Sequence, residues 1–148
     1  MNIYIPYITT EIGGADATEK YGDWWRESEF SVQGASLTEP ENYRCEMFEV
    51  AFDVVVGDTV HVLSMIYSSG DSFGKETGLG EILWVFKDRT LAEDAKLYWE
   101  ANNEFVERAA SFQVDGGKTV TMSNPAYGYF ENCSSVDLHT FIITKEGS

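Results

Sequence analysis

Residues 59–86 read TVHVLSMIYSSGDSFGKETGLGEILWVF, and this stretch decides the fold. Its first part, Thr59 to Tyr67, is rich in β-branched and aromatic residues and is typical of a strand. Its last part, Glu81 to Phe86, is apolar on both faces and predicts a central strand. Small and polar residues separate the two parts. The stretch therefore predicts two strands joined by a glycine- and serine-rich loop.

Outward from this stretch, the sequence predicts further short strands. Gly57 and Asp58 form a hairpin signal just before Thr59, and residues 115–118 form another. The further strands are expected at residues 2–9, 24–32, 45–56, 111–114, 119–122 and 136–144.

One helix is expected after the central strand. Thr90 and Glu93 have the spacing of a capping box. An apolar face that begins at Leu91 recurs at helical spacing, which predicts a helix over residues 90–104. About seven strands and one helix predict an α+β fold, a mostly antiparallel sheet with the helix packed on one face. We expect residues 1–148 to form a single compact domain.

The strongest global property of the chain is its charge. It has 25 acidic and 10 basic residues, a formal net charge of −15. Such a surface repels nucleic acid and anionic membranes, so we expect no direct binding to either. It attracts a basic partner, and solubility alone is the alternative explanation. No stretch has the length of a membrane span or the pattern of a signal peptide, and we expect a cytoplasmic protein.

The cysteines and histidines are few and widely spaced. Cys45 and Cys133 match no metal motif, and His61 and His139 add no ligand pattern, so we expect neither a metal nor a cofactor. The two cysteines are expected to be separate thiols, with one disulfide as the alternative. Because short strands leave sheet edges, the chain can also form a homo-oligomer.

The Ser/Gly segment is the first candidate site. It combines hydroxyls, glycines, a carboxylate and a lysine, which suits either an anion nest or a structural connection between strands. The spacing of a P-loop is absent. The residues that would bind a small anionic ligand are Ser68, Ser69, Gly70, Asp71, Ser72, Gly74 and Lys75.

Residues 70–72 (GDS) resemble the opening block of the GDSL family of serine hydrolases. The resemblance implies Ser72 as the nucleophile, with Asp137 and His139 as its acid and base. The family spaces its aspartate and histidine one residue further apart and has a larger α/β fold. We therefore expect a protein that is not an enzyme.

An acidic and aromatic segment is the second candidate site. Two adjacent tryptophans on a strand face opposite sides, so one of them is expected on the less buried face. Exposed aromatic residues beside carboxylates are typical of a protein-binding surface, and a tryptophan packed at a sheet edge is the alternative. The residues predicted to bind a partner are Asp23, Trp24, Trp25, Glu27 and Glu29.

Three separated motifs, YSSGDSFG at residues 67–74, WVF at 84–86 and YGYFE at 127–131, resemble those of a group of small bacteriophage-encoded proteins. The resemblance implies a phage accessory protein in the host cytoplasm and supplies no mechanism. We expect it to act by binding, and to inhibit a host defence protein with a basic surface through its acidic and aromatic surface. The alternative is a sponge that binds a phosphate-containing small molecule or nucleotide at residues 68–75.

Overall fold

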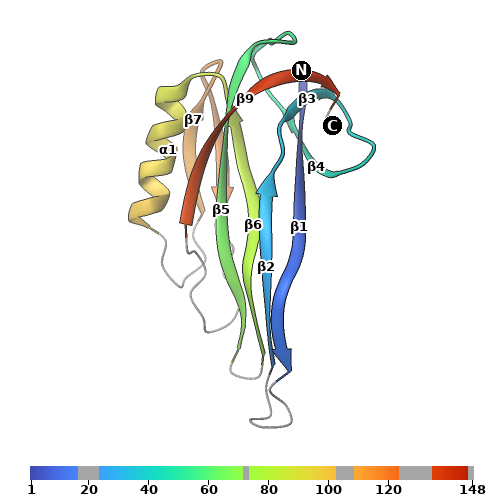
Figure 1. The fold of residues 1–148 in the computed structure, drawn as a ribbon. Helices are drawn as coiled ribbons and strands as arrows, with labels where there is room; N and C mark the ends of the chain where they lie inside the picture. Colours follow the sequence, from blue (N-terminus) through green and yellow to red (C-terminus); the bar gives the residue numbers. More distant parts are fainter. Residues whose placement is uncertain (17–23, 72–73, 103–108, 124–134, 147–148) are drawn as a thin grey trace.

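The computed structural model describes residues 1–16, 24–71, 74–102, 109–123 and 135–146, which form nine strands and one helix (Figure 1). The first strands are β1 (Asn2–Asp16), β2 (Trp24–Val32), β3 (Ala35–Thr38) and β4 (Arg44–Glu49). The long strands β5 (Thr59–Asp71) and β6 (Gly74–Phe86) precede helix α1 (Arg89–Ala101). The last strands are β7 (Ala109–Val114), β8 (Lys118–Ser123) and β9 (Ser135–Glu146).

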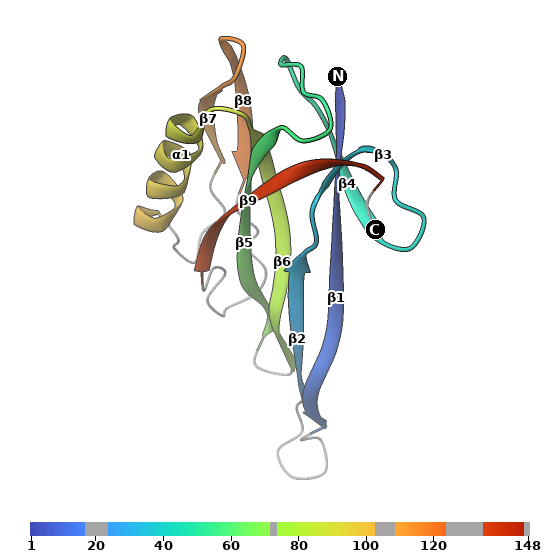
Figure 2. The ribbon, with the colours of Figure 1, turned by 45° about the horizontal axis from the view of Figure 1, so that its top comes forward.

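Six of the described strands close into a barrel. Paired strands follow the order β2-β6-β5-β9-β3-β1, and β1 also pairs with β2, which closes the ring. Strand β4 pairs with the other edge of β1, away from β2 and β3. Strand β9 makes the closure possible, because its first part pairs with β5 and its last residues pair with β3 (Figure 2).

The predicted α+β class is wrong, because the sheet closes on itself and the protein is mostly β. Two parallel pairings, β2 with β6 and β3 with β9, join segments that are far apart in the sequence. Hairpin signals predict only antiparallel strands that follow one another along the chain, so they reveal neither pairing. The expected helix is present and packs on the outside of the barrel wall (Figure 1).

Two hydrophobic clusters lie on opposite faces of β5. Val60 and Val62 face the inner cluster, to which β1 contributes Ile3 and Ile5, and all four side chains are fully buried. Leu63 and the strands β6 and β9 contribute to the outer cluster, against α1 and the β7–β8 hairpin. The alternation of buried side chains between the two faces is the pattern expected of a strand covered on both sides.

Trp99 lies at the centre of the outer cluster. Its side chain is fully buried, and its ring lies 5.1 Å from the ring of Tyr98 and 5.7 Å from that of Phe112, measured between centroids. Trp99 therefore joins α1 to the β7–β8 hairpin.

Helix α1 has a different cap from the predicted one. Asp88 Oδ1 accepts hydrogen bonds from the backbone N–H groups of Thr90 and Leu91, at 2.8 and 3.4 Å. Aspartate caps a helix as well as threonine does, and Asp88 is fixed because its own N–H donates to the carboxylate of Asp115 at 2.8 Å. Glu93, expected to complete a capping box, instead accepts a 2.7 Å hydrogen bond from Arg89.

The helix also ends earlier than predicted, at residue 101 instead of 104. Among the described residues, no helix combines the length and the apolar character that crossing a bilayer requires.

Strand boundaries differ most from the sequence prediction at β1, at β4 and at the β5–β6 pair, and β3 was not predicted as a strand. Strand β1 continues to Asp16 because β2 pairs with it from Tyr7 to Asp16. The strand expected over residues 45–56 ends at Glu49, because its partner β1 begins at Asn2. Met1 and Val50 exchange the last two backbone hydrogen bonds of this pairing, at 2.9 and 3.2 Å. Strand β5 runs to Asp71 and β6 begins at Gly74, so the paired strands include much of the predicted loop.

Two glycines allow β2 to lie against β6. Gly78 has a φ of 75°, and a side chain there would overlap the backbone carbonyl oxygen of Ser28. A side chain at Gly80 would overlap the ring of Phe30. The close approach of the two strands therefore depends on the absence of a Cβ at both positions.

Candidate functional site

The predicted anion-binding segment forms the paired ends of two strands. Gly70 is paired with Lys75, and Asp71 with Gly74, while Ser72 lies outside the described residues. A nest requires consecutive backbone N–H groups to converge on one point, whereas strand pairing directs them alternately to the two sides. The described part of the segment thus has the backbone of a hairpin and not that of a nest.

The predicted acid and base of the hydrolase, Asp137 and His139, lie far along the barrel from Asp71, the described residue next to Ser72. Asp137 and His139 of β9 are opposite Ser64 and Val62 of β5. Asp71, which adjoins Ser72, is seven residues further along β5, roughly 23 Å at about 3.3 Å per residue. Asp137 accepts a 3.2 Å hydrogen bond from the Ser135 hydroxyl, and the ring of His139 stacks on Phe141. The structure therefore does not bring this aspartate and histidine to the end of the hairpin.

The predicted partner-binding segment is adjacent to the Ser/Gly segment. Trp24 is opposite Gly74 and Trp25 is opposite Lys75, so two sites that the sequence treated separately share one end of the barrel. At these positions the backbone of β2 is paired with β6 on one side and with β1 on the other, so β2 is not an edge strand here. Glu27 and Glu29 are exposed on one face of β2, and residue 23 lies outside the described residues.

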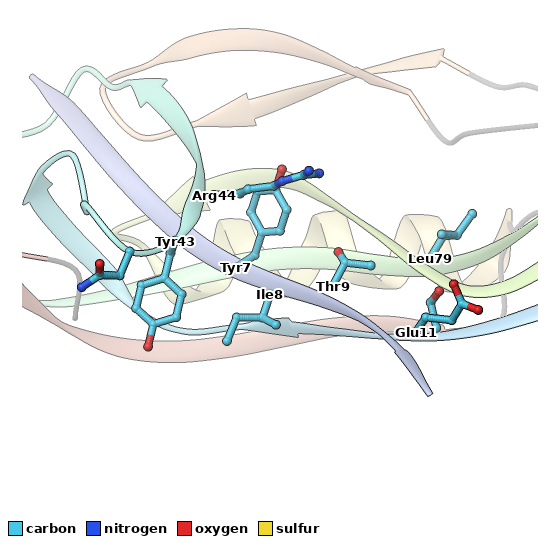
Figure 3. A pocket seen from close by; sticks show the side chains of 9 residues that line it. Tyr7, Ile8, Thr9, Glu11, Tyr43, Arg44 and Leu79 are labelled. Carbon is cyan, nitrogen blue, oxygen red and sulfur yellow. The ribbon is translucent and has the colours of Figure 1, made fainter. Parts of the chain in front are cut away.

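A groove beside β1 is the site that sequence reasoning missed. Strand β4 pairs with β1 only as far as the pair Tyr7 and Arg44, whereas β1 continues to Asp16. Beyond Arg44, the first residue of β4, an open groove of about 620 Å³ follows β1 (Figure 3). It is lined by Tyr7, Ile8, Thr9, Glu11, Ser28, Asn42, Tyr43, Arg44 and Leu79.

The backbone direction of β1 shows which of its groups face the groove. The carbonyl oxygen of Pro6 accepts a 2.8 Å hydrogen bond from the Gln33 N–H, so the backbone groups of residue 6 point toward β2 and β3. Backbone groups alternate along a strand, so those of Ile8 and Thr10 also point toward β2. Those of Thr9 and Glu11 point the other way, where no described strand pairs with them.

The groove exists because β1 extends further than β4 along their shared edge. The sequence could have indicated it only by predicting this longer β1, but the predicted first strand ended at residue 9. The extension to residue 16 contains Gly13 and Gly14, which argue against a strand. Long-range pairing with β2 overrides that local preference.

His61 is a structural residue whose protonation is coupled to stability. Its side chain is 7% exposed, and its Nδ1 lies 2.9 Å from the hydroxyl of Thr140. Burial, and then the positive charge of Arg89, lower the pKa of His61. The unfolded chain therefore takes up the proton first, and the stability present above the unfolded pKa, about 6.5, is lost as the pH falls toward the folded value.

We expect the free energy of unfolding to fall between about pH 7 and pH 5, where histidine titrates, and His61→Phe to remove part of that slope. Urea denaturation at a series of pH values measures the slope. An identical slope in the wild-type protein and the variant would show that His61 is not the group responsible.

The thiol of Cys45 is disfavoured as a nucleophile, and the described residues contain no metal-binding cluster. Cys45 has a free thiol, and burial, then Glu39 and Glu46, raise its pKa, so the reactive thiolate is disfavoured. Cys133 lies outside the described residues. Within the described ranges, no group of three or more His, Cys, Asp or Glu side chains is arranged to hold a metal ion.

Compared with protein-family models, with curated protein sequences and with solved structures, the chain matches none of them.

Proposed function

We propose that the protein acts by binding a protein that has a basic surface, and that this binding inhibits its partner. The binding surface is the acidic arm, which we define as residues 9–13 of β1 and 27–29 of β2. The pairing of the two strands places Glu27 opposite Gly13, Ser28 opposite Glu11, and Glu29 opposite Thr10. Glu27 and Glu29 lie on one face of this ladder, and Glu11, opposite Ser28, lies on the other face at the same level. Exposed carboxylates therefore flank both faces of the arm, and this arrangement carries the proposal.

The distribution of cations also supports the proposal. Arg44, in the groove beside the arm, is exposed and takes part in neither of the two ion pairs between described residues. The other cations whose side chains are described lie around α1 and on β8 and β9: Lys87, Arg89, Lys96, Lys118 and Lys145. Because the whole chain has a net charge of −15, it attracts positively charged proteins over distances beyond direct contact.

The nature of the target follows from this charge and from the resemblance to phage proteins. A nucleic-acid-binding groove is a basic surface, and an acidic protein that occupies it excludes the nucleic acid. We therefore propose a host protein of this kind, such as a nuclease used in defence, as the partner.

Capture from bacterial lysate tests the proposal. The immobilised wild-type protein should retain a partner at low salt and release it as the salt concentration rises, because contacts between exposed charges are screened. The double variant Glu27→Gln/Glu29→Gln should reduce the apparent affinity at least about ten-fold, which corresponds to about 1.4 kcal/mol. Quantitative mass spectrometry of the retained proteins measures the loss.

The matched control is Asp94→Asn/Glu100→Gln, which removes the same charge from two exposed positions on α1. The control should bind as the wild-type protein does. Equal losses in both double variants would indicate a general charge effect, and retention of the partner by Glu27→Gln/Glu29→Gln would contradict the proposed surface.

A further inference from the structure

We propose that the open edge of β1 takes up an extended basic segment of the partner as an added strand. This inference rests on the proposed function and specifies how the acidic arm would engage its partner. The position that the segment would occupy continues the line of β4 beyond the pair formed by Tyr7 and Arg44, beside Thr9 and Glu11 of β1 (Figure 3). The groove of about 620 Å³ lies at this vacant position.

The backbone of β1 offers the hydrogen bonds that an added strand needs. The N–H and C=O groups of Thr9 and Glu11 point away from β2, and among the described strands none pairs with them on that side. An incoming strand that exchanges hydrogen bonds with both residues gains up to four, the contact that gives affinity in strand addition.

The side chains along the groove determine the chemistry of the segment. Thr9 and Glu11 lie on the same face of β1 as Tyr7, whose ring is 5.5 Å from that of Phe30. A strand antiparallel to β1 runs in the direction of β4, so its C-terminal end meets Arg44. Glu11 attracts a lysine or arginine directly opposite, whereas Arg44 repels a cation placed at its own end. The segment that fits therefore has its cation opposite Glu11 and an uncharged residue next to Arg44.

A second copy of this chain fits the same edge less well. Two antiparallel β1 edges paired about Glu11 would place the Glu11 carboxylates of both copies opposite each other, and each chain has a net charge of −15. Like charges on directly paired strands are destabilising, so the charge favours a basic segment over self-association.

Nuclear magnetic resonance with two model peptides tests the inference. The probes are acetylated and amidated hexapeptides, VTKTVT and VTETVT, which place a lysine or a glutamate opposite Glu11. With the lysine peptide at millimolar concentration, amide hydrogen exchange at Thr9 and Glu11 should slow at least ten-fold. Exchange at Thr10 should not change, because its N–H already faces β2. The glutamate peptide should bind at least ten-fold more weakly than the lysine peptide.

The variant Glu11→Lys is the second part of the test, because it should reverse the preference between the two peptides. Since Glu11 is exposed, the substitution should leave the thermal unfolding temperature of the protein nearly unchanged. Unchanged exchange at Thr9 and Glu11 with either peptide would overturn strand addition. So would protection on the outer edge of β4 instead, or protection that rises with protein concentration without any peptide.

If exchange is unaffected while lysate capture remains sensitive to Glu27→Gln/Glu29→Gln, the proposed function stands and only strand addition fails. If lysate capture is also unchanged by Glu27→Gln/Glu29→Gln, both the proposed function and strand addition fail.

Discussion

The substitution Gly78→Ala is expected to lower the free energy of unfolding by more than about 3 kcal/mol. Two costs add at this position. A φ of 75° strains any residue with a Cβ, by about 1–2 kcal/mol. The new methyl group would also overlap the backbone carbonyl oxygen of Ser28, which cannot move without shifting β2 away from β6. Urea denaturation monitored by tryptophan fluorescence gives the value.

Gly57→Ala is the control for that experiment. Gly57 also has a positive φ, 100°, but a Cβ there would meet no atom within 4 Å. It should therefore show the backbone strain alone, about 1–2 kcal/mol. If Gly78→Ala is no more destabilising than Gly57→Ala, β2 does not approach β6 as described.

The second large effect is expected at Trp99. Trp99→Ala should lower the free energy of unfolding by about 3–5 kcal/mol, because it leaves a large cavity between α1 and the β7–β8 hairpin. Trp99→Phe should be much less damaging. The Trp99 Nε1–H is buried and finds no acceptor among the described residues, so removing it relieves an unsatisfied donor and offsets part of the lost packing.

Leu97→Ala on the same helix serves as the reference, since Leu97 is 64% exposed and should change stability by less than about 1 kcal/mol. Thermal and urea unfolding of the three variants measure the order. Equal losses for Trp99→Ala and Leu97→Ala would contradict the position of α1 against the barrel.

Local signals predicted the elements whose partners are close in the sequence. The β7–β8 hairpin was expected from its turn signal, and β5 and β6 were expected as two strands joined by a loop. The hairpin predicted at Gly57 and Asp58, between the strands expected at residues 45–56 and 59–67, was wrong, because β4 pairs with β1 and β5 pairs with β6 and β9. Helix α1 was expected from its apolar spacing, although Asp88 replaced Thr90 as its cap. Each of these elements depends on residues that are close to one another in the sequence.

The closure of the barrel could not be predicted in the same way. It depends on the parallel pairings of β2 with β6 and of β3 with β9, and the pair Ala35 and Ile143 joins residues near opposite ends of the chain. Alternating apolar residues show that a strand has a buried face, but they do not name its neighbour. Gly78 and Gly80 fall in the loop that the sequence predicts before the central strand, whereas they lie within β6 and allow β2 to approach it.

The candidate site was only partly visible for the same reason. Glu27 and Glu29 were identified because carboxylates beside tryptophans are a local pattern. Glu11 was not, because it joins them only through the pairing of β1 with β2. The open edge at Thr9 depends on where β4 begins, because Arg44, its first residue, pairs with Tyr7 and no described strand continues along β1 beyond that pair.

Hydrogen exchange of the protein, alone and bound to the partner captured from lysate, tests the central claim most directly. The account predicts slower exchange on binding in the acidic arm, at residues 9–13 and 27–29, with little change in α1 or the β7–β8 hairpin. Slower exchange confined to α1 and that hairpin, with the arm unchanged, would contradict the account.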